Sequence, residues 1–274
     1  MPNNAPRTPL ESRQQHPLVI LGGGYTGQVI FRRAMAEGWE VVCTSRHPQK
    51  HLTDIPLRHR LEFDLTCPES WNALPAPLHI IWCFPACPLT LVQEFMASRL
   101  DPPVRMIVLG STSAYPSEGK VVTENHMPNV HLPRVQGEEY LRETAGAIVI
   151  RLAGLYGPGR NVLDWIRKGK IRNSARLVNL LHVEDAAGIC LKALTHAPEG
   201  TTYLASDGTP RPWSEICTYA EKKWQITIPP LTHPADPGKH IDNRKLLTEL
   251  GYTFRFPDLY HALDRLETHK LAEE

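Results

Sequence analysis

The stretch Leu18-Val-Ile-Leu-Gly-Gly-Gly-Tyr-Thr-Gly27 decides the fold, because an apolar strand runs directly into a G-x-G-x-x-G pattern. The first glycine, Gly22, permits a tight turn from strand to helix. The second, Gly24, lets a pyrophosphate approach the backbone, and the third, Gly27, lets helix and strand pack closely. A helical stretch and a second apolar strand, 40–44, follow in the required order. The segment therefore predicts a βαβ unit that binds a dinucleotide.

The second strand ends in Thr44-Ser45-Arg46-His47 and offers no carboxylate to the 2′-hydroxyl of a ribose. Arg46 instead suits a 2′-phosphate, because its planar guanidinium pairs bidentately with phosphate oxygens. The alternative is a solvated arginine at the start of a loop. We expect NADP(H) as the cofactor, with NAD(H) the less favoured form.

Composition narrows the class of protein. The chain has 274 residues and a formal net charge of +1, so its charge gives no reason to expect binding to nucleic acid or an anionic membrane. No apolar run approaches the roughly 20 residues of a membrane span. The six scattered cysteines fit neither a zinc site nor a disulfide framework, which favours reduced thiols, no metal and a cytoplasmic protein.

Strands and helices alternate through the first two thirds of the chain. This order predicts an α/β fold of the Rossmann type, with a doubly wound parallel sheet. The last third is punctuated by prolines and carries two amphipathic helices, which indicates a smaller C-terminal α+β lid over the substrate. The expected division is a flexible leader (1–16), a dinucleotide-binding domain (17–154 and 178–205) and a substrate domain (155–177 and 206–274).

Ligands of such sheets bind beyond the carboxyl ends of the strands. Asp64 follows the third strand and is expected to meet the adenine amino group or to form a turn. The candidate cofactor-binding residues at these strand ends are Gly22, Gly24, Tyr25, Thr26, Gly27, Arg46, Asp64, Leu65, Phe84, Pro85 and Ala86.

Several segments together resemble one family, the extended and atypical short-chain dehydrogenase/reductases of the NAD-dependent epimerase/dehydratase type. Besides the glycine turn and Asp64-Leu65, they are Gly110-Ser-Thr-Ser-Ala-Tyr115, Arg151-Leu-Ala-Gly-Leu-Tyr-Gly-Pro-Gly159 and Leu181-His-Val-Glu-Asp185. The resemblance points to a bacterial branch of the family and covers nearly the whole chain.

The resemblance implies that hydride moves between the nicotinamide and a substrate carbon that bears oxygen. In the family, a Ser or Thr holds that oxygen, a Tyr acts as acid or base, and a Lys four residues later lowers the Tyr pKa. A phenol needs such a cation because its pKa of about 10 makes it a poor base near neutrality. Ser111 matches the Ser/Thr position, with a hydroxyl that caps a turn as the alternative reading.

The Tyr-x-x-x-Lys pair is absent from residues 125–139, where the family carries it. Aligning the helix by Glu138 places Val130 at the Tyr position and Arg134 at the Lys position. Arg134 either contacts the cofactor ribose or forms a surface pair with Glu138. His131 and Tyr115 are the candidates to replace the missing acid/base group.

Two segments near the C-terminal part are further candidates for the cleft. His182 and Asp185 either face it or, for Asp185, cap a helix. The segment 239–244 is expected to reach into the substrate pocket.

Two functions remain open on these residues. One is an NADP(H)-dependent oxidoreductase or epimerase/dehydratase-like enzyme that acts on a polar, sugar- or nucleotide-linked carbonyl or alcohol. The other is an NADP(H)-binding sensor or scaffold that has lost catalysis. Ser111 and the C-terminal lid favour the enzyme, whereas the missing Tyr and Lys favour the sensor. A small molecule is the expected partner, and the resemblance allows a homodimer.

Overall fold

The computed structural model describes residues 16–76, 78–99, 101–228 and 236–273, so the predicted leader lies outside the described residues except for residue 16. The chain divides into two compact units. The first comprises the described parts of Met1–Gly110, Val130–Ile150 and Ala187–Thr202, and the second those of Ser111–Asn129, Arg151–Ala186 and Tyr203–Glu274. The division into a dinucleotide domain and a substrate domain stays a prediction.

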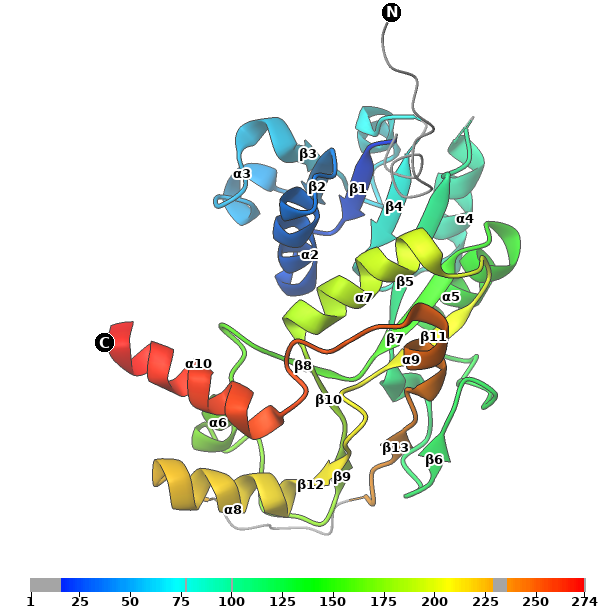
Figure 1. The fold of residues 1–274 in the computed structure, drawn as a ribbon. Coiled ribbons are helices and arrows are strands. Elements are labelled where there is room, and N and C mark those ends of the chain that lie inside the picture. The colour runs from blue at the N-terminus through cyan, green and yellow to red at the C-terminus, as the bar shows by residue number, and fades with distance from the viewer. Residues whose placement is uncertain (1–15, 77, 100, 229–235, 274) are drawn as a thin grey trace, which may run out of the picture. The chain divides into compact units, whose positions relative to one another are not determined.

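A seven-stranded sheet runs through the first unit, although most of one edge strand, 202–205, is assigned to the second (Figure 1). Its strand order is β11-β7-β5-β4-β1-β2-β3, so the chain starts near the middle and returns to the other side. The pairs β1–β2, β1–β4, β2–β3 and β4–β5 are parallel. The strands are β1 (Leu18–Leu21), β2 (Val41–Ser45), β3 (Arg60–Glu62), β4 (His79–Trp82), β5 (Arg105–Ser111), β7 (Ile148–Leu152) and β11 (Thr202–Ala205).

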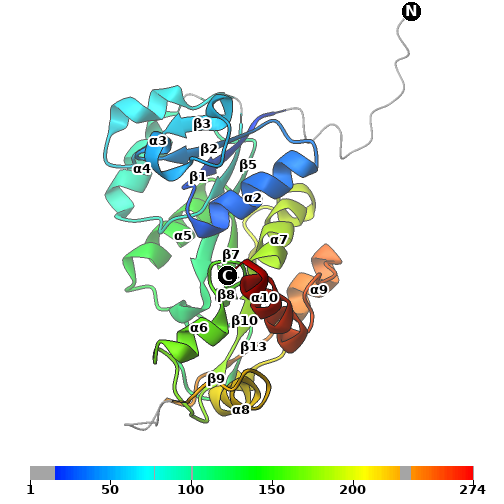
Figure 2. The same ribbon diagram turned by 90° about the vertical axis from the view of Figure 1, so that its left-hand side faces the viewer.

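Helices cover both faces of this sheet, with α2 and α7 on one side and α4 and α5 on the other (Figure 2). Parallel strands need such crossovers, which bury the sheet on both faces. The helices are α2 (Tyr25–Ala36), α3 (Pro48–His51), α4 (Leu89–Ser98), α5 (Pro133–Thr144) and α7 (Val183–His196), and the short 3-10 turns are η1 (Leu57–His59) and η2 (Pro68–Ala73).

Apolar burial explains why these strands lie in the centre. All four residues of β1 and of β4 are buried. Phe95 of α4 packs edge-on against Phe63, Trp71 and Trp82, with ring centroids 5.3, 5.5 and 5.7 Å away. Buried aromatic side chains contribute strongly to core stability, so this cluster fixes α4 and η2 against the sheet.

The second unit is built from short strands and three packed helices. Its two-stranded pairings are β10–β8 and β13–β6, both parallel, and β12–β9, which is antiparallel. The elements are η3 (Thr112–Ala114), β6 (Val121–Val122), β8 (Gly154–Tyr156), α6 (Val162–Arg167), β9 (Leu177–Val178), β10 (Leu180–His182), β12 (Arg211–Pro212), α8 (Trp213–Trp224), β13 (His240–Ile241), α9 (Arg244–Leu250) and α10 (Leu259–Glu273).

Helices α6, α8 and α10 share one apolar core in this unit. Leu163, Ile166, Ile216 and Leu263 are each 0% exposed, so each helix contributes a fully buried face. This burial supplies the second unit with a core of its own.

The alternation of strands and helices confirms the predicted doubly wound α/β fold. The third strand is short, and after it the chain turns at Asp64, whose carboxylate accepts hydrogen bonds from the backbone N–H and the hydroxyl of Thr66. The stretch 178–183 contains the last residue of β9, all of β10 and the first residue of α7.

Candidate functional site

The turn after β1 has the geometry that the glycine pattern predicts. Gly22 has a φ of +96°, a conformation that favours glycine. Its N–H donates to Oγ1 of Thr44 over 3.0 Å, and the N–H of Gly23 donates to the carbonyl of the same threonine over 2.6 Å. Thr44 is completely buried in β2, so the turn is fastened to the neighbouring strand.

The other two glycines serve different purposes. A Cβ on Gly27 would lie 2.1 Å from the carbonyl oxygen of Gly22, so α2 packs onto the turn only if this residue is glycine. A Cβ on Gly24 would meet nothing within 4 Å. Gly24 is therefore not needed for packing, and its missing side chain leaves space at the start of α2.

The N-terminal end of α2 suits an anion. Gly24 is the N-cap residue, and no side chain caps the helix. The first turn contains no acidic residue. Because the first amide groups of a helix lack carbonyl partners and lie at the positive end of its dipole, this end favours a phosphate group.

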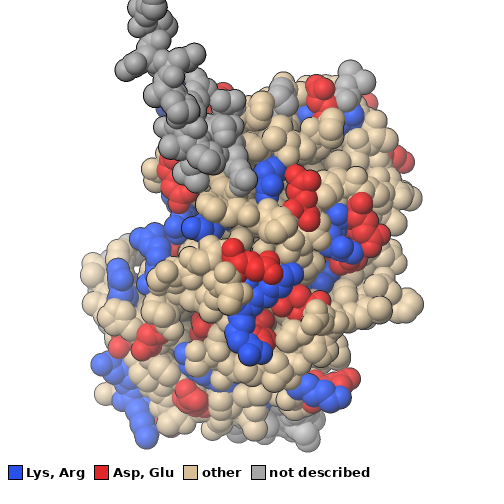
Figure 3. Space-filling model, turned by 45° about the vertical axis from the view of Figure 1, so that its right-hand side comes forward, with Lys and Arg blue, Asp and Glu red and all other residues tan. Residues whose placement is uncertain are grey.

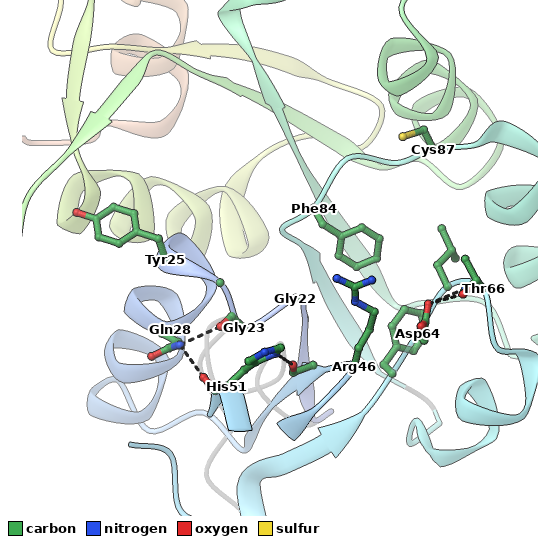
Figure 4. A pocket seen from close by; sticks show the side chains of 14 residues that line it. Gly22, Gly23, Tyr25, Gln28, Arg46, His51, Asp64, Thr66, Phe84 and Cys87 are labelled. Atoms are coloured by element: carbon green, nitrogen blue, oxygen red, sulfur yellow. Dashed lines mark hydrogen bonds between the residues drawn. The ribbon is translucent and has the colours of Figure 1, made fainter. Parts of the chain in front are cut away.

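A cavity of about 590 Å³ opens at this turn, entirely within the first unit (Figure 4). Seven predicted cofactor-binding residues line it: Gly22, Gly24, Tyr25, Arg46, Asp64, Leu65 and Phe84. Seven residues that we did not predict also line it: Gly23, Gln28, Ser45, His51, Phe63, Thr66 and Cys87. Five predicted residues, Thr26, Gly27, Pro85, Ala86 and Arg134, are not among the lining residues.

Arg46 lies at the carboxyl end of β2, and its guanidinium points toward Phe84 and Asp64 (Figure 4). Within the described residues its side chain makes no hydrogen bond or ion pair. Hydrogen bonding to the Thr66 backbone, and more weakly the charge of Arg46, holds the pKa of Asp64 below its usual value. Asp64 is thus a turn-forming carboxylate, and Arg46 is available to an anionic ligand.

A second polar pair stands beside Arg46. Nδ1 of His51 lies 3.0 Å from Oγ of Ser45, and the backbone N–H of His47 donates to the same oxygen over 3.2 Å. The side chain of Gln28 donates to the carbonyls of Gly23 and His51 over 2.9 and 3.2 Å. These bonds join α3 to the glycine turn.

Ser111 belongs to the second unit and closes β5. Its Oγ lies 2.8 Å from Oγ of Ser113 and accepts from the N–H of that residue over 3.2 Å. The hydroxyl therefore caps η3, as the alternative reading proposed. It also belongs to a pair of hydroxyl groups, and the exposed Ser113 connects that pair to solvent.

Tyr115 follows the same turn but is buried, with 3% of its surface exposed. Its hydroxyl accepts a hydrogen bond of 2.7 Å from Nη1 of Arg151, which is 2% exposed. The guanidinium carbon also lies 5.4 Å from the centroid of the phenol ring. The Tyr115 side chain is thus held in the core of the second unit.

Lys239 reaches this turn from a distant part of the sequence. Its Nζ donates to the carbonyl of Thr112 over 3.0 Å and to that of Tyr115. Burial, and to a smaller extent the charge of Arg176, lowers its pKa. The expected reach of segment 239–244 into a substrate pocket stays a prediction. What the structure shows is a buried ammonium that binds the backbone after Ser111.

His131 and Arg134 lie in the first unit, at the start of α5. His131 is exposed, and Arg134 is half-buried in the first helical turn. Glu138 is 1% exposed, so its carboxylate is not at the surface. The contact of Arg134 with the cofactor ribose or with Glu138 stays a prediction. A Cβ on Gly110 would lie 2.8 Å from this carboxylate, which shows how closely α5 packs on β5.

A second cavity, of about 660 Å³, lies wholly within the second unit. His182 lines it and stacks on Phe256 with ring centroids 3.7 Å apart. Burial, and then the charges of Arg255 and Arg265, lowers the pKa of His182 to about 4. The imidazole is therefore neutral at physiological pH.

Asp185 does not line this cavity, and its carboxylate binds residues outside α7. It is fully buried and accepts hydrogen bonds from the hydroxyl of Tyr252 and the backbone N–H groups of Arg255 and Phe256, over 3.0, 2.7 and 3.0 Å. The carboxylate therefore fastens the segment before α10 to the start of α7.

Other classes of site find no support in the part of the chain that the structure describes. No group of three or more His, Cys, Asp or Glu there is placed to hold a metal ion. All six cysteines are free thiols. None of the described helices combines the length and the apolar character that crossing a bilayer requires. Basic and acidic side chains are interspersed over the face shown in Figure 3.

Comparison with known proteins supports the fold and leaves the activity open. No family model matches this sequence. Protein YeeZ of Escherichia coli strain K12 is 27% identical over 276 aligned positions, which cover 88% of this chain and 96% of that protein.

Three solved structures share the fold. A proposed NAD-dependent epimerase/dehydratase from Methylobacillus flagellatus has a TM-score of 0.76 at 24% identity, covering 93% of this chain and 99% of that one. MoeE5, in complex with UDP-glucose and NAD, has a TM-score of 0.75 at 17% identity, covering 94% and 100%. The human epimerase family protein SDR39U1, with NADPH, has a TM-score of 0.69 at 16% identity, covering 92% and 99%. The fold of epimerase/dehydratase-type proteins, which the resemblance implied, is confirmed.

Proposed function

We propose that this protein is an NADP(H)-dependent enzyme of the extended or atypical short-chain dehydrogenase/reductase type. Its substrate would be a polar carbonyl or alcohol, linked to a sugar or a nucleotide. The observation that carries the proposal is the cavity at the glycine turn. At the end of β2 this cavity has Arg46, and not the Asp or Glu that would bind a ribose 2′-hydroxyl.

The residues of this cavity fit a nicotinamide dinucleotide. The space that Gly24 leaves, together with the uncapped N-terminal end of α2, suits a pyrophosphate. Arg46 suits the 2′-phosphate that distinguishes NADP(H) from NAD(H). SDR39U1 has been solved with NADPH and MoeE5 with NAD, so the fold accommodates either form.

When bound, the cofactor would exchange a hydride with a substrate carbon that bears oxygen. The protein's own residues would orient that oxygen and manage its proton. Ser111 would donate a hydrogen bond to the oxygen, and its contact with Ser113 would give the proton a path to solvent. Arg134 would hold the ribose.

The proton donor is the part of the proposal that departs most from the family. Val130 stands at the position of the family's tyrosine and has no proton to transfer. The Tyr115 hydroxyl is bound to Arg151 in the core. We therefore propose that the Ser111–Ser113 pair transfers the proton of the substrate oxygen, with exposed His131 as the second candidate.

Titration of NADPH and NADH against the purified protein tests the cofactor. We expect NADPH to bind more tightly, and Arg46→Ala to weaken it by roughly 1.5–3 kcal/mol, the range for hydrogen bonds to charged groups. Arg58→Ala is the matched control, because Arg58 is exposed and does not line the cavity. Tighter binding of NADH, or equal effects of the two substitutions, would contradict the assignment.

Activity is tested on a panel of carbonyl compounds and sugar nucleotides, with both cofactor absorbance and products analysed. Product analysis is needed because an epimerase interconverts isomers without net cofactor oxidation. We expect Ser111→Ala to abolish turnover and leave NADPH affinity unchanged. Turnover is then compared between His131→Gln and Ser113→Ala. The substitution that lowers turnover more identifies the side chain that transfers the proton.

A second function, an NADP(H)-binding sensor or scaffold, has one observation in its favour. Val130 and Arg134 stand where the family carries its Tyr and Lys, and the nearby tyrosine, Tyr115, is buried. Tight NADPH binding without turnover of any panel compound, accompanied by a change of shape on binding, would favour this function.

A further inference from the structure

We propose that His51 is a second ligand of the cofactor's 2′-phosphate and makes the preference for NADP(H) over NAD(H) stronger in acid. The inference rests on the proposed function, since it concerns the same cavity. Its starting point is that Ser45, Arg46 and His51 line one cavity, and that Oγ of Ser45 and Nδ1 of His51 lie 3.0 Å apart.

The position of His51 is fixed by its neighbours. Leu52, the next residue, is completely buried. The Leu52 side chain packs against Gly23: a Cβ atom added to Gly23 would lie only 2.3 Å from Cδ2 of Leu52. Gln28 also binds the backbone carbonyl of His51. The buried Leu52 side chain, packed on the glycine turn, therefore holds the exposed imidazole of His51 at the cavity.

The hydrogen-bonding groups match a phosphate. Nδ1 of His51 is engaged by Ser45, whereas Nε2 makes no hydrogen bond among the described residues. A protonated imidazole donates from both ring nitrogens. Together with the fork of Arg46 and the hydroxyl of Ser45, it would surround a phosphate with donors.

The charges around His51 make its protonation depend on the ligand. Its own helix contributes Lys50, and His47 lies next to it with ring centroids 5.7 Å apart. Arg46 follows β2, and loop and β3 residues contribute Asp54, Glu62 and Asp64. A bound phosphate would favour the protonated imidazole, because the two charges are opposite. Imidazoles change charge between about pH 5 and 8, so affinity should vary there.

Calorimetry with NADP⁺ and NAD⁺ at pH 5.5, 6.5, 7.5 and 8.5 tests this inference without any turnover. The measured quantity is the ratio of the NAD⁺ to the NADP⁺ dissociation constant. The phosphate itself titrates near pH 6, so the wild-type ratio is compared with that of His51→Gln at each pH. We expect the wild-type ratio to exceed the variant ratio by about tenfold in acid, and the two to converge by pH 8.5.

His47→Gln is the matched control, because that histidine is the N-cap residue of the same short helix, α3, but does not line the cavity. It should retain the wild-type ratio at every pH. Equal pH profiles for wild type and His51→Gln, or a loss of the acid preference only in His47→Gln, would overturn the role of His51 while leaving the cofactor assignment intact. Failure of the wild type to bind either dinucleotide would instead overturn the proposed function.

Discussion

The hydroxyl of Tyr115 accepts a 2.7 Å hydrogen bond from Nη1 of Arg151. The phenol comes from the turn after β5 and the guanidinium from β7, and both are nearly inaccessible to solvent. A buried guanidinium needs partners, because an unpaired charge in a protein interior is costly. The tyrosine hydroxyl is therefore a structural partner of Arg151.

Tyr115→Phe should destabilise the protein without removing a proton donor. The change deletes one hydrogen-bond acceptor of the buried Arg151 guanidinium, at a cost of roughly 1–3 kcal/mol. Urea denaturation measures this loss. Tyr140→Phe is the control, because among the described residues the Tyr140 hydroxyl makes no hydrogen bond. A variant with unchanged stability and abolished turnover would show instead that Tyr115 is the acid/base group.

Two glycine substitutions separate cofactor binding from packing. Gly24→Ala places its methyl group where no protein atom lies within 4 Å, so we expect unchanged stability and NADPH affinity weakened by about tenfold or more. Gly27→Ala forces a methyl group against the Gly22 carbonyl, so both affinity and stability should fall. Thermal unfolding and NADPH titration of the two variants provide the measurements. Unaltered affinity in Gly24→Ala would place the pyrophosphate elsewhere.

Stability should fall in acid because of His182. Its pKa is about 4 in the folded protein and 6.5 in its unperturbed state. The unfolded chain therefore binds more protons between these values, and stability decreases as the pH falls through this window. The contribution is at most about 3 kcal/mol.

Urea denaturation from pH 4.5 to 7.5 should show a flatter pH dependence for His182→Gln than for the wild type. His261→Gln is the control, because His261 is exposed on α10. A wild-type and a His182→Gln profile with the same slope would show that the imidazole is not kept neutral by burial.

Local patterns in the sequence were sufficient for the fold and for much of the cofactor cavity. Consecutive apolar residues predicted β1, and the glycine spacing predicted the turn that Gly22 and Gly27 make. Arg46 was identified by its position directly after a strand. These features depend on neighbours close in sequence, which is why they could be found without a structure.

Side chains whose role depends on distant contacts could not be assigned in this way. His51 was not predicted, because its contacts with Ser45 and Gln28 require the α3 turn to fold back on the glycine turn. Asp185 was expected at a cleft or a cap, but it binds a segment nearly 70 residues further on. For both residues, the hydrogen-bond partners depend on how the chain folds back on itself, and the local sequence does not show this.

Lys239 provides the last prediction, because it joins the turn after Ser111 to a segment more than 120 residues away. Lys239→Met keeps the length of the side chain but removes the donors to the carbonyls of Thr112 and Tyr115. Small displacements of a positioned group cost up to about a hundredfold in rate. We therefore expect loss of turnover on whichever substrate the panel identifies, with NADPH affinity retained because the cavity residues belong to the other unit.

Hydrogen exchange tests the same variant without a substrate. The amides of residues 111–116 should exchange faster in Lys239→Met, whereas those of 18–30 should be unchanged, because only the former depend on the ammonium group. Lys120→Met is the control, since its ammonium is exposed and pairs only with exposed Glu118 among the described residues. Unchanged exchange at 111–116 in Lys239→Met would mean that the turn holds Ser111 in place by its own capping bonds.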